Sequence, residues 1–206
     1  MKKLLHIIAT PRGDESRTLK VSKVFLEQFK STHPDWTVDK LDLTQENLPS
    51  LTVKRVDGKY ALLGGKDLSG EMKDAWAEII KHIERFMSAD AYLISIPMWN
   101  FSIPYTLKQY IDIIFQPKYL FRYTAAGVEG LVTNRKMVVI TSRGGDYSSA
   151  MKSADFQEPY LRFAFGFVGL KDITFINAQP MDMGQDLQAQ KIAAAQDLAK
   201  AIAQAI

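Results

Sequence analysis

The sequence contains no cysteine and only three histidines among its 206 residues. Without cysteine, the chain cannot form a disulfide framework, a thiolate zinc site, an iron–sulfur cluster or a cysteine nucleophile. His6, His33 and His82 show none of the spacings typical of metal ligands. We expect no metal site, with His6 packed in the core and His33 and His82 on solvated helix faces.

Long hydrophobic runs and an excess of one charge are also missing. No apolar stretch approaches the roughly 18 residues of a membrane helix, and the one after Met1 is too short for a secretory signal because Pro11 follows it closely. Lys and Arg number 26 against 23 Asp and Glu, a formal charge of +3, which is too balanced to indicate nucleic-acid binding. We therefore expect a cytoplasmic protein with neither a membrane nor a nucleic acid as partner.

Short apolar runs alternate with segments of helical periodicity along the whole chain. Nearly continuous apolar runs are typical of strands buried on both faces of a parallel sheet. The expected strands are residues 3–9, 37–43, 91–97, 136–142 and 173–178, and the expected helices are residues 16–30, 71–88, 104–115, 159–168 and 186–206. Segments 49–70 and 116–133 remain as long connections, which are usually functional or interaction elements.

This alternation predicts an α/β fold. We expect a doubly wound, five-stranded parallel sheet of flavodoxin-like order 2-1-3-4-5, with helices on both faces, in one domain of residues 1–206. In such sheets the ligand binds beyond the carboxyl ends of the strands, at the point where the strand order reverses. That rule selects three loops, which follow the first, third and fourth strands.

The first loop, residues 10–18, has the composition of a phosphate site. It contains neither a G-x-G-x-x-G nor a P-loop motif. Ser16 is a candidate helix N-cap. The hydroxyls of Thr10, Ser16 and Thr18, with free helix amides, suit a phosphate, to which Arg17 or Arg12 would add charge. The structural alternative is a capped helix with two solvated arginines.

The second loop, residues 97–104, places Met98, Trp99, Asn100 and Phe101 directly after a buried strand. Aromatic side chains at that edge can wall a planar ring, while Asn100 and backbone amides bond to its rim. The alternative is a lead-in to the next helix, with aromatics that plug the end of the sheet.

The third loop contains Ser142, Arg143, Gly144 and Gly145. Paired glycines let the backbone pass close to a ligand, and Ser142 and Arg143 offer donors to its carbonyl oxygens. The same sequence also fits an ordinary turn. Together, the three loops suit flavin mononucleotide (FMN), with its phosphate on the first loop and its isoalloxazine ring against the other two.

The same segments carry a resemblance to a known family. The chain resembles the flavodoxin-like, FMN-dependent NADH-azoreductases and quinone reductases over nearly its whole length. The resemblance rests on residues 97–101 (PMWNF), 121–133 (FRYTAAGVEGLVT), 139–145 (VITSRGG) and 160–169, with the early P-R-G…S-x-[ST] loop. Thr10 stands where Ser is more usual, and Trp99 where Tyr is common.

The resemblance implies a role for each loop. Thr10, Ser16, Arg17 and Thr18 would hold the FMN phosphate. The isoalloxazine would be held by Met98, Trp99, Asn100 and Phe101 and by Ser142, Arg143, Gly144 and Gly145. Tyr123 and Phe167 match aromatic positions that border the substrate space.

The activity implied is reduction of quinones and cleavage of azo compounds, with NADH (or NADPH) as donor, in a ping-pong sequence of two-electron hydride transfers. No catalytic side chain is assigned, because the flavin carries the chemistry. A homodimer is expected from the resemblance and from the apolar segments 111–115 and 121–123, which a monomer need not bury completely. The alternative is a flavodoxin-type one-electron carrier, which would bind the same cofactor.

Overall fold

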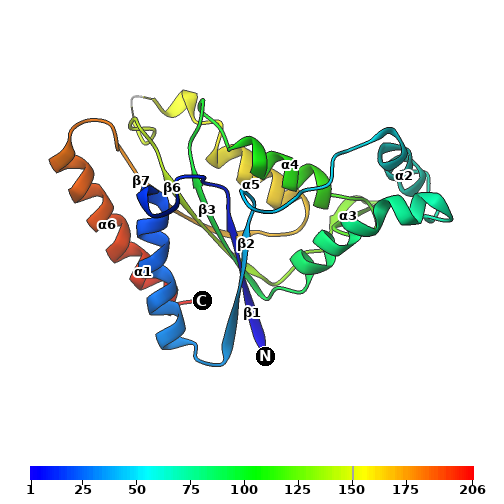
Figure 1. Cartoon of the computed structure of the whole chain (residues 1–206), viewed down its shortest axis with the longest axis horizontal. Coiled ribbons are helices and arrows are strands. Elements are labelled where there is room, and N and C mark those ends of the chain that lie inside the picture. The colour runs from blue at the N-terminus through cyan, green and yellow to red at the C-terminus, as the bar shows by residue number, and fades with distance from the viewer. Residues whose placement is uncertain (150) are drawn as a thin grey trace.

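The computed structural model describes residues 1–149 and 151–206. Its centre is a parallel sheet of five strands in the order β2-β1-β3-β6-β7 (Figure 1). The strands are β1 (Lys2–Ile8), β2 (Trp36–Asp42), β3 (Ala91–Pro97), β6 (Lys136–Ser142) and β7 (Asp172–Ala178). Counted along the chain, these five strands have the order 2-1-3-4-5, so the predicted topology is confirmed.

Helices cover both faces of this sheet. Figure 1 shows α1 (Arg17–Thr32) and α6 (Gln185–Gln204) on one face, and α3 (Glu71–Met87), α4 (Tyr105–Ile114) and α5 (Glu158–Phe167) on the other. Side chains alternate along each strand, so Leu4 of β1 packs in the cluster with α1 while Leu5 and Ile7 pack in the opposite one. The two buried clusters cover the two faces of the sheet. Because all five strands are parallel, their carboxyl ends lie at one edge of it.

The long connection 49–70 contains a helix that the sequence analysis missed. α2 (Val53–Leu63) buries only Gly58 and Leu62, so its apolar stripe is too weak to reveal a helix. Gly58 lies against the indole of Trp76, where a Cβ atom would overlap the ring, and Trp76 Nε1 donates to Arg55 O at 2.9 Å. Backbone proximity, rather than a row of apolar side chains, joins α2 to α3.

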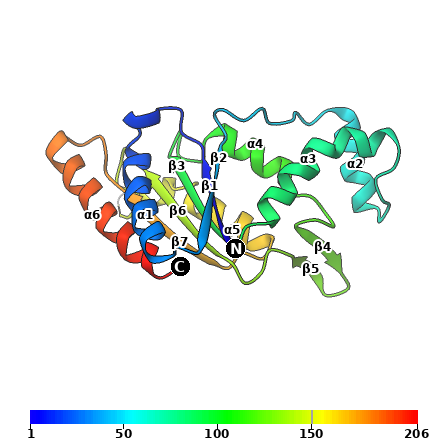
Figure 2. The same cartoon turned by 60° about the horizontal axis from the view of Figure 1, so that its bottom comes forward.

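The second long connection, 116–133, contains a β-hairpin of β4 (Phe121–Thr124) and β5 (Gly127–Gly130). Figure 2 shows it standing apart from the main sheet, next to α2 and α3. Lys118 ties its base to the connection after α2, because Lys118 Nζ donates to Gly65 O at 3.0 Å and to Asp67 Oδ1 at 2.8 Å.

The apolar segment of α4 is buried within the chain, which corrects one expectation. Ile111, Ile113 and Ile114 are at most 3% exposed, so this segment offers no surface for a second copy. Among the residues described, no helix has the length and apolarity to cross a membrane.

Two of the three histidines lie in the interior. His6 is buried as expected, with its Nε2 2.8 Å from Ser95 Oγ. The expectation for His82 was wrong: it is buried on α3, with its ring edge-on to that of Tyr110. Burial lowers the pKa of His82 below its ordinary value.

Candidate active site

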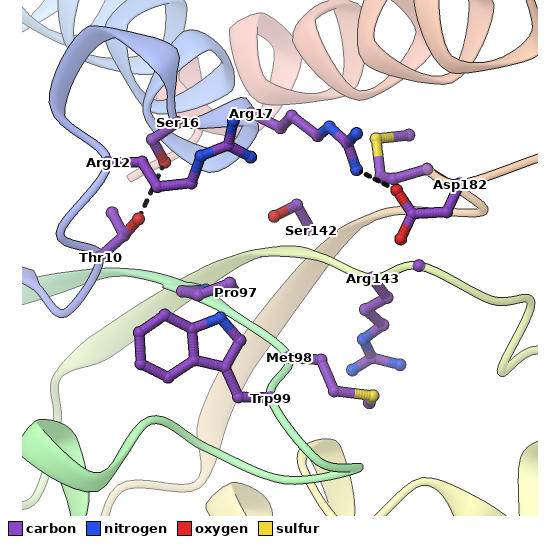
Figure 3. A pocket seen from close by; sticks show the side chains of 12 residues that line it. Thr10, Arg12, Ser16, Arg17, Pro97, Met98, Trp99, Ser142, Arg143 and Asp182 are labelled. Atoms are coloured by element: carbon purple, nitrogen blue, oxygen red, sulfur yellow. Dashed lines mark hydrogen bonds and ion pairs between the residues drawn. The ribbon is translucent and has the colours of Figure 1, made fainter. Parts of the chain in front are cut away.

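A cavity of about 250 Å³ opens at the carboxyl edge of the sheet (Figure 3). The three predicted loops meet in it, joined by a fourth segment that follows β7. Its lining residues are Thr10, Arg12, Ser16, Arg17, Pro97, Met98, Trp99, Ser142, Arg143, Gly144, Met181 and Asp182. Segments far apart in the sequence therefore build one site, as the topology predicts.

The first loop forms the positive end of α1. Ser16 is the N-cap of this helix, as predicted, and its Oγ accepts from Leu19 N–H at 3.3 Å and from Thr10 Oγ1 at 3.2 Å. Within the described residues, the N–H groups of Arg17 and Thr18 donate to no protein acceptor. These two donors lie at the positive end of the helix dipole, which favours an anion.

Thr18 takes a different place from the one predicted. Its side chain is fully buried and does not line the cavity. Its Oγ1 lies 2.8 Å from Ser142 Oγ, so the hydroxyl links α1 to the third loop beneath the cavity. Only its backbone N–H remains available to a ligand.

A carboxylate that the sequence analysis missed lies in the same cavity. Asp182 Oδ1 accepts from Arg17 Nη1 at 2.6 Å (Figure 3). Asp182 follows β7 at the same edge of the sheet, and the strand-end rule would have found it had the fifth strand been included. The part of the cavity next to the first loop therefore contains two guanidinium groups, those of Arg12 and Arg17, and one carboxylate.

The second loop is a tight two-residue turn. Trp99 and Ser102 exchange both backbone hydrogen bonds at 3.0 Å. Between them, Asn100 and Phe101 have φ values of 47° and 69°, the left-handed conformation that a type I′ turn requires at both central positions. Asn tolerates this conformation well, whereas Phe rarely adopts it, so the turn explains Asn100 and shows Phe101 to be strained.

The turn presents aromatic side chains to solvent. Trp99 is 37% and Phe101 47% exposed. Trp99 also lines a second, more apolar cavity of about 890 Å³, together with Leu51, Asn100, Tyr105 and Tyr160. The two cavities therefore adjoin at the Trp99 side chain.

The third loop passes close to the segment after β7. A Cβ atom at Gly144 would lie 2.5 Å from Asp182 Oδ2, and one at Gly145 would lie 2.8 Å from Met151 Sδ. Within the described chain, the N–H groups of both glycines have no protein acceptor. Gly144 thus leaves room and a free N–H donor at the cavity wall, and Gly145, which does not line the cavity, follows it with a second free donor.

Arg143 differs most from its predicted role as a donor to the ring. Its side chain is 2% exposed, and its Nη1 donates to Asp155 Oδ2 at 2.8 Å. Its Nε donates to Thr141 Oγ1 at 3.1 Å and to Gln157 Oε1 at 3.2 Å. These partners hold Nε and Nη1, while Nη2 is buried, 3.7 Å from Glu158 Oε2, and has no hydrogen-bond partner among the described residues. The protein therefore fixes the guanidinium through two of its three nitrogens.

Tyr123 and Phe167 are not brought to either cavity of the described chain. Both contact Phe121, with ring centroids 5.9 Å and 4.9 Å away. Phe167 ends α5, a helix whose ten residues span about 15 Å and whose opposite end adjoins the second loop. Within one chain these aromatics therefore lie one helix length from the site.

No group of three or more His, Asp or Glu side chains that could hold a metal ion occurs in the part of the chain described. The ion pairs of the site join Arg17 to Asp182, and Arg143 to both Asp155 and Glu158.

Comparison with known proteins places the chain among relatives of similar length. The sequence profile of the flavodoxin-like fold family matches residues 2–202. An FMN-dependent NADH:quinone oxidoreductase of Nitratidesulfovibrio vulgaris is 37% identical over 206 residues, which cover 98% of this chain and 99% of that protein. One from Trichormus variabilis is 39% identical over 209 residues, which cover 100% and 99%.

Solved structures agree with the sequence relatives. An azoreductase from Bacillus anthracis superposes with a TM-score of 0.91 at 29% identity, over the full length of both chains. An FMN-dependent NADH-azoreductase from the same species, in complex with FMN, gives a TM-score of 0.85 at 28% identity, covering 98% of this chain and 100% of the other. The chain therefore belongs to the flavodoxin-like family of FMN-dependent NADH:quinone oxidoreductases.

Proposed function

We propose that this protein is an enzyme that binds FMN at the carboxyl edge of its sheet and uses NADH or NADPH to reduce quinones and azo compounds. The observation that carries the proposal is the adjacency of a cationic helix terminus and an aromatic turn in one cavity. An elongated ligand with a phosphate at one end and a planar ring at the other matches this cavity, with the phosphate at the helix terminus and the ring at the aromatic turn. The relatives and the FMN-bound neighbour support the same assignment.

The residues of the cavity fit such a ligand. Arg17 and Thr18 would donate their backbone N–H groups to the phosphate, with the charges of Arg12 and Arg17 nearby and Ser16 fixing the loop. The loop provides one phosphate seat and lacks the glycine motif of dinucleotide sites, which supports FMN rather than FAD.

The other two loops fit the ring. Trp99, which lines the cavity, would cover a face of the ring, and the free N–H groups of Gly144 and Gly145 would bond to its polar edge. Phe101 lines neither cavity of the described chain. Donors fixed at that edge stabilise negative charge without reorganising. Bound FMN would supply two-electron redox chemistry. The chain itself needs to bind the flavin, orient the substrate against it and shield both from solvent.

The second cavity supports an enzyme over a one-electron carrier. Its mainly apolar lining around Trp99, Tyr105 and Tyr160 suits an aromatic acceptor, and a carrier has no need of a cavity for one. The nicotinamide and the acceptor would occupy this space in turn. We therefore propose a ping-pong sequence, in which the first product leaves before the second substrate binds.

Steady-state kinetics test this proposal. Double-reciprocal plots against NADH at several quinone concentrations should be parallel. Release of the cofactor by heat should give FMN in a one-to-one ratio with the chain. Intersecting lines would mean separate sites for the two substrates, and stoichiometric FAD would refute the cofactor assignment.

We further propose that residues 1–206 form one domain and that the enzyme is a cytoplasmic homodimer. One five-stranded main sheet with one buried cluster on each face supports one domain. The exposed hairpin supports the dimer: Tyr123 is 63% exposed at one helix length from its own site, so it would reach a substrate only in the site of a second copy. The cytoplasmic location rests on the sequence composition.

A further inference from the structure

We propose that Gln157 is a positioning residue that, with the buried pair Arg143–Asp155, fixes the spacing of the two loops flanking the isoalloxazine. This inference rests on the proposed function for its consequence, but not for its geometry. Gln157 precedes α5 and is fully buried.

The amide of Gln157 is bonded to both loops at once. Its Nε2 donates to Pro97 O at 2.9 Å and to Ser102 O at 3.4 Å, on either side of the Asn100–Phe101 turn. Its Oε1 accepts from Arg143 Nε in the third loop at 3.2 Å. One side chain therefore joins two loops that directly bond to each other at their bases, where Met98 N–H donates to Ser142 O at 2.9 Å.

The neighbours of Gln157 reinforce this connection. Phe156 N–H donates to Phe101 O at 3.0 Å, and Ser102 Oγ donates to Phe156 O at 3.3 Å. Asp155 Oδ1 accepts from Gln157 N–H at 2.9 Å, while Asp155 Oδ2 accepts from Arg143. The segment 155–157 is thus bonded to both loops through backbone and side chain.

The contacts of residues 155–157 with the two loops, here called the clamp, hold a strained turn in place. Phe101 at φ 69° is in a conformation that non-glycine residues keep only where the surroundings enforce it. The bonds from residues 156 and 157 end on Phe101 O and Ser102 O, so they hold the turn where it would otherwise relax. Relaxation would change the position of Trp99 relative to Gly144, which lines the same cavity, and with it the width of the slot for a planar ring.

Only an amide satisfies all three partners. The side chain at position 157 must supply donors for two carbonyl oxygens and an acceptor for the Arg143 guanidinium. Glu at this position would keep the acceptor but present a carboxylate to Pro97 O and Ser102 O. Leu would fill the space and make none of the three bonds.

Gln116 offers a matched control. It is also fully buried, and its Nε2 donates to two backbone carbonyls, Asp112 O at 2.8 Å and Ile113 O at 3.0 Å. These bonds close the end of α4 and touch neither loop. Gln116→Leu therefore removes a similar pair of buried bonds away from the site.

The first arm of the test uses the protein without cofactor. Hydrogen–deuterium exchange of the Trp99 and Ser102 amides, which close the turn, should accelerate about tenfold or more in Gln157→Leu and Gln157→Glu, because the bonds to Pro97 O and Ser102 O, on either side of the turn, are lost. Gln116→Leu should leave these rates at the parental level even where it lowers the melting temperature equally. Parental exchange at the turn in both Gln157 variants would overturn the inference, whether or not the protein binds FMN.

The second arm uses the FMN-loaded protein. Loss of the clamp should weaken FMN binding about tenfold and shift both the visible flavin spectrum and the reduction potential in the Gln157 variants, with no such change in Gln116→Leu. A parental spectrum, potential and affinity in the Gln157 variants would also overturn the inference. Failure of the parent to bind FMN would refute the proposed function alone, since the first arm does not depend on it.

Discussion

At the scale of single residues, the proposed phosphate site combines the guanidinium groups of Arg12 and Arg17 with one opposing carboxylate, that of Asp182. Asp182 holds Arg17 at 2.6 Å in the cavity where an anion would bind. Its side chain is 64% exposed, so solvent screens the pair and its energetic effect is small.

Asp182→Asn should therefore tighten FMN binding about two- to fivefold, because it removes a negative charge and frees Arg17 for the phosphate. Arg17→Ala should weaken binding, and both effects should shrink at high salt. Fluorescence titration of the apoprotein with FMN measures them. Asp186→Asn, in the exposed first turn of α6, is the control. Weaker binding in Asp182→Asn would mean that the carboxylate itself contacts the ligand.

His6 makes a separate prediction about stability. Burial, assisted by the charge of Lys40, lowers the pKa of His6 from 6.5 to about 3. Below about pH 6.5 the unfolded chain binds a proton that the folded chain refuses, so stability falls as the pH decreases towards 3. The carboxyl groups ordinarily titrate below about pH 5, which leaves the interval from about pH 6.5 to 5 to the histidines.

Denaturant unfolding at several pH values between about 7 and 5 should show this loss, at a slope of up to about 1.4 kcal/mol per pH unit for each such group. His6→Gln should lower stability overall, by disturbing the bond to Ser95, but flatten the slope. Buried His82, with its lowered pKa, contributes in the same direction. An unchanged slope in His6→Gln would contradict the attribution of this pH dependence to His6.

At the scale of elements, the contact between α2 and α3 depends on a glycine. A Cβ atom at Gly58 would overlap the Trp76 indole, so Gly58→Ala should destabilise the protein by about 1–3 kcal/mol through overpacking. Gly166→Ala, in α5 with open space around it, is the control and should be neutral or stabilising by up to about 1 kcal/mol. Equal effects of the two substitutions in denaturant unfolding would contradict the packing argument.

The same elements show what the sequence could predict. The three central strands, β1, β3 and β6, were predictable because both of their faces are buried, which produces continuous apolar runs such as Ile7–Ile8 and Leu93–Ile94. The edge strands β2 and β7 bury fewer of their residues. α2 was not predictable, since it packs through Gly58 rather than an apolar stripe. The hairpin was also missed, because three of the four β4 residues are exposed.

The site followed the same pattern. Its location was predictable from topology, and Ser16 from helix-capping chemistry. The roles of Thr18 and Arg143 were not, because their bonding partners, Ser142, Asp155 and Gln157, come from other elements whose side-chain directions the sequence does not specify.

At the scale of the whole molecule, the aromatic hairpin of one chain does not reach either cavity of the same chain. Tyr123 is exposed, as are Tyr105 at 73% and Leu51 at 45%, which line the second cavity. A second copy placing its hairpin near that cavity would cover this apolar surface. Sedimentation at micromolar concentration should therefore give about twice the chain mass of 23.2 kDa.

Tyr123→Ala should raise the KM for the acceptor and leave FMN affinity unchanged, because Tyr123 lies away from its own cofactor cavity. A fully active monomer would refute the shared site. A dimer in which Tyr123→Ala has parental kinetics would remove Tyr123 from it.

We propose that this protein takes electrons from a nicotinamide without a partner reductase and stores them on a flavin bound at the carboxyl edge of its sheet. Anaerobic addition of one equivalent of NADH to the FMN-loaded protein tests it most directly. We expect complete loss of the oxidised flavin absorbance without a partner reductase, and its recovery when a quinone is added after the NAD⁺ has been removed. Persistence of the oxidised spectrum with both NADH and NADPH, in protein that a one-electron donor does reduce, would contradict the account and identify a carrier instead.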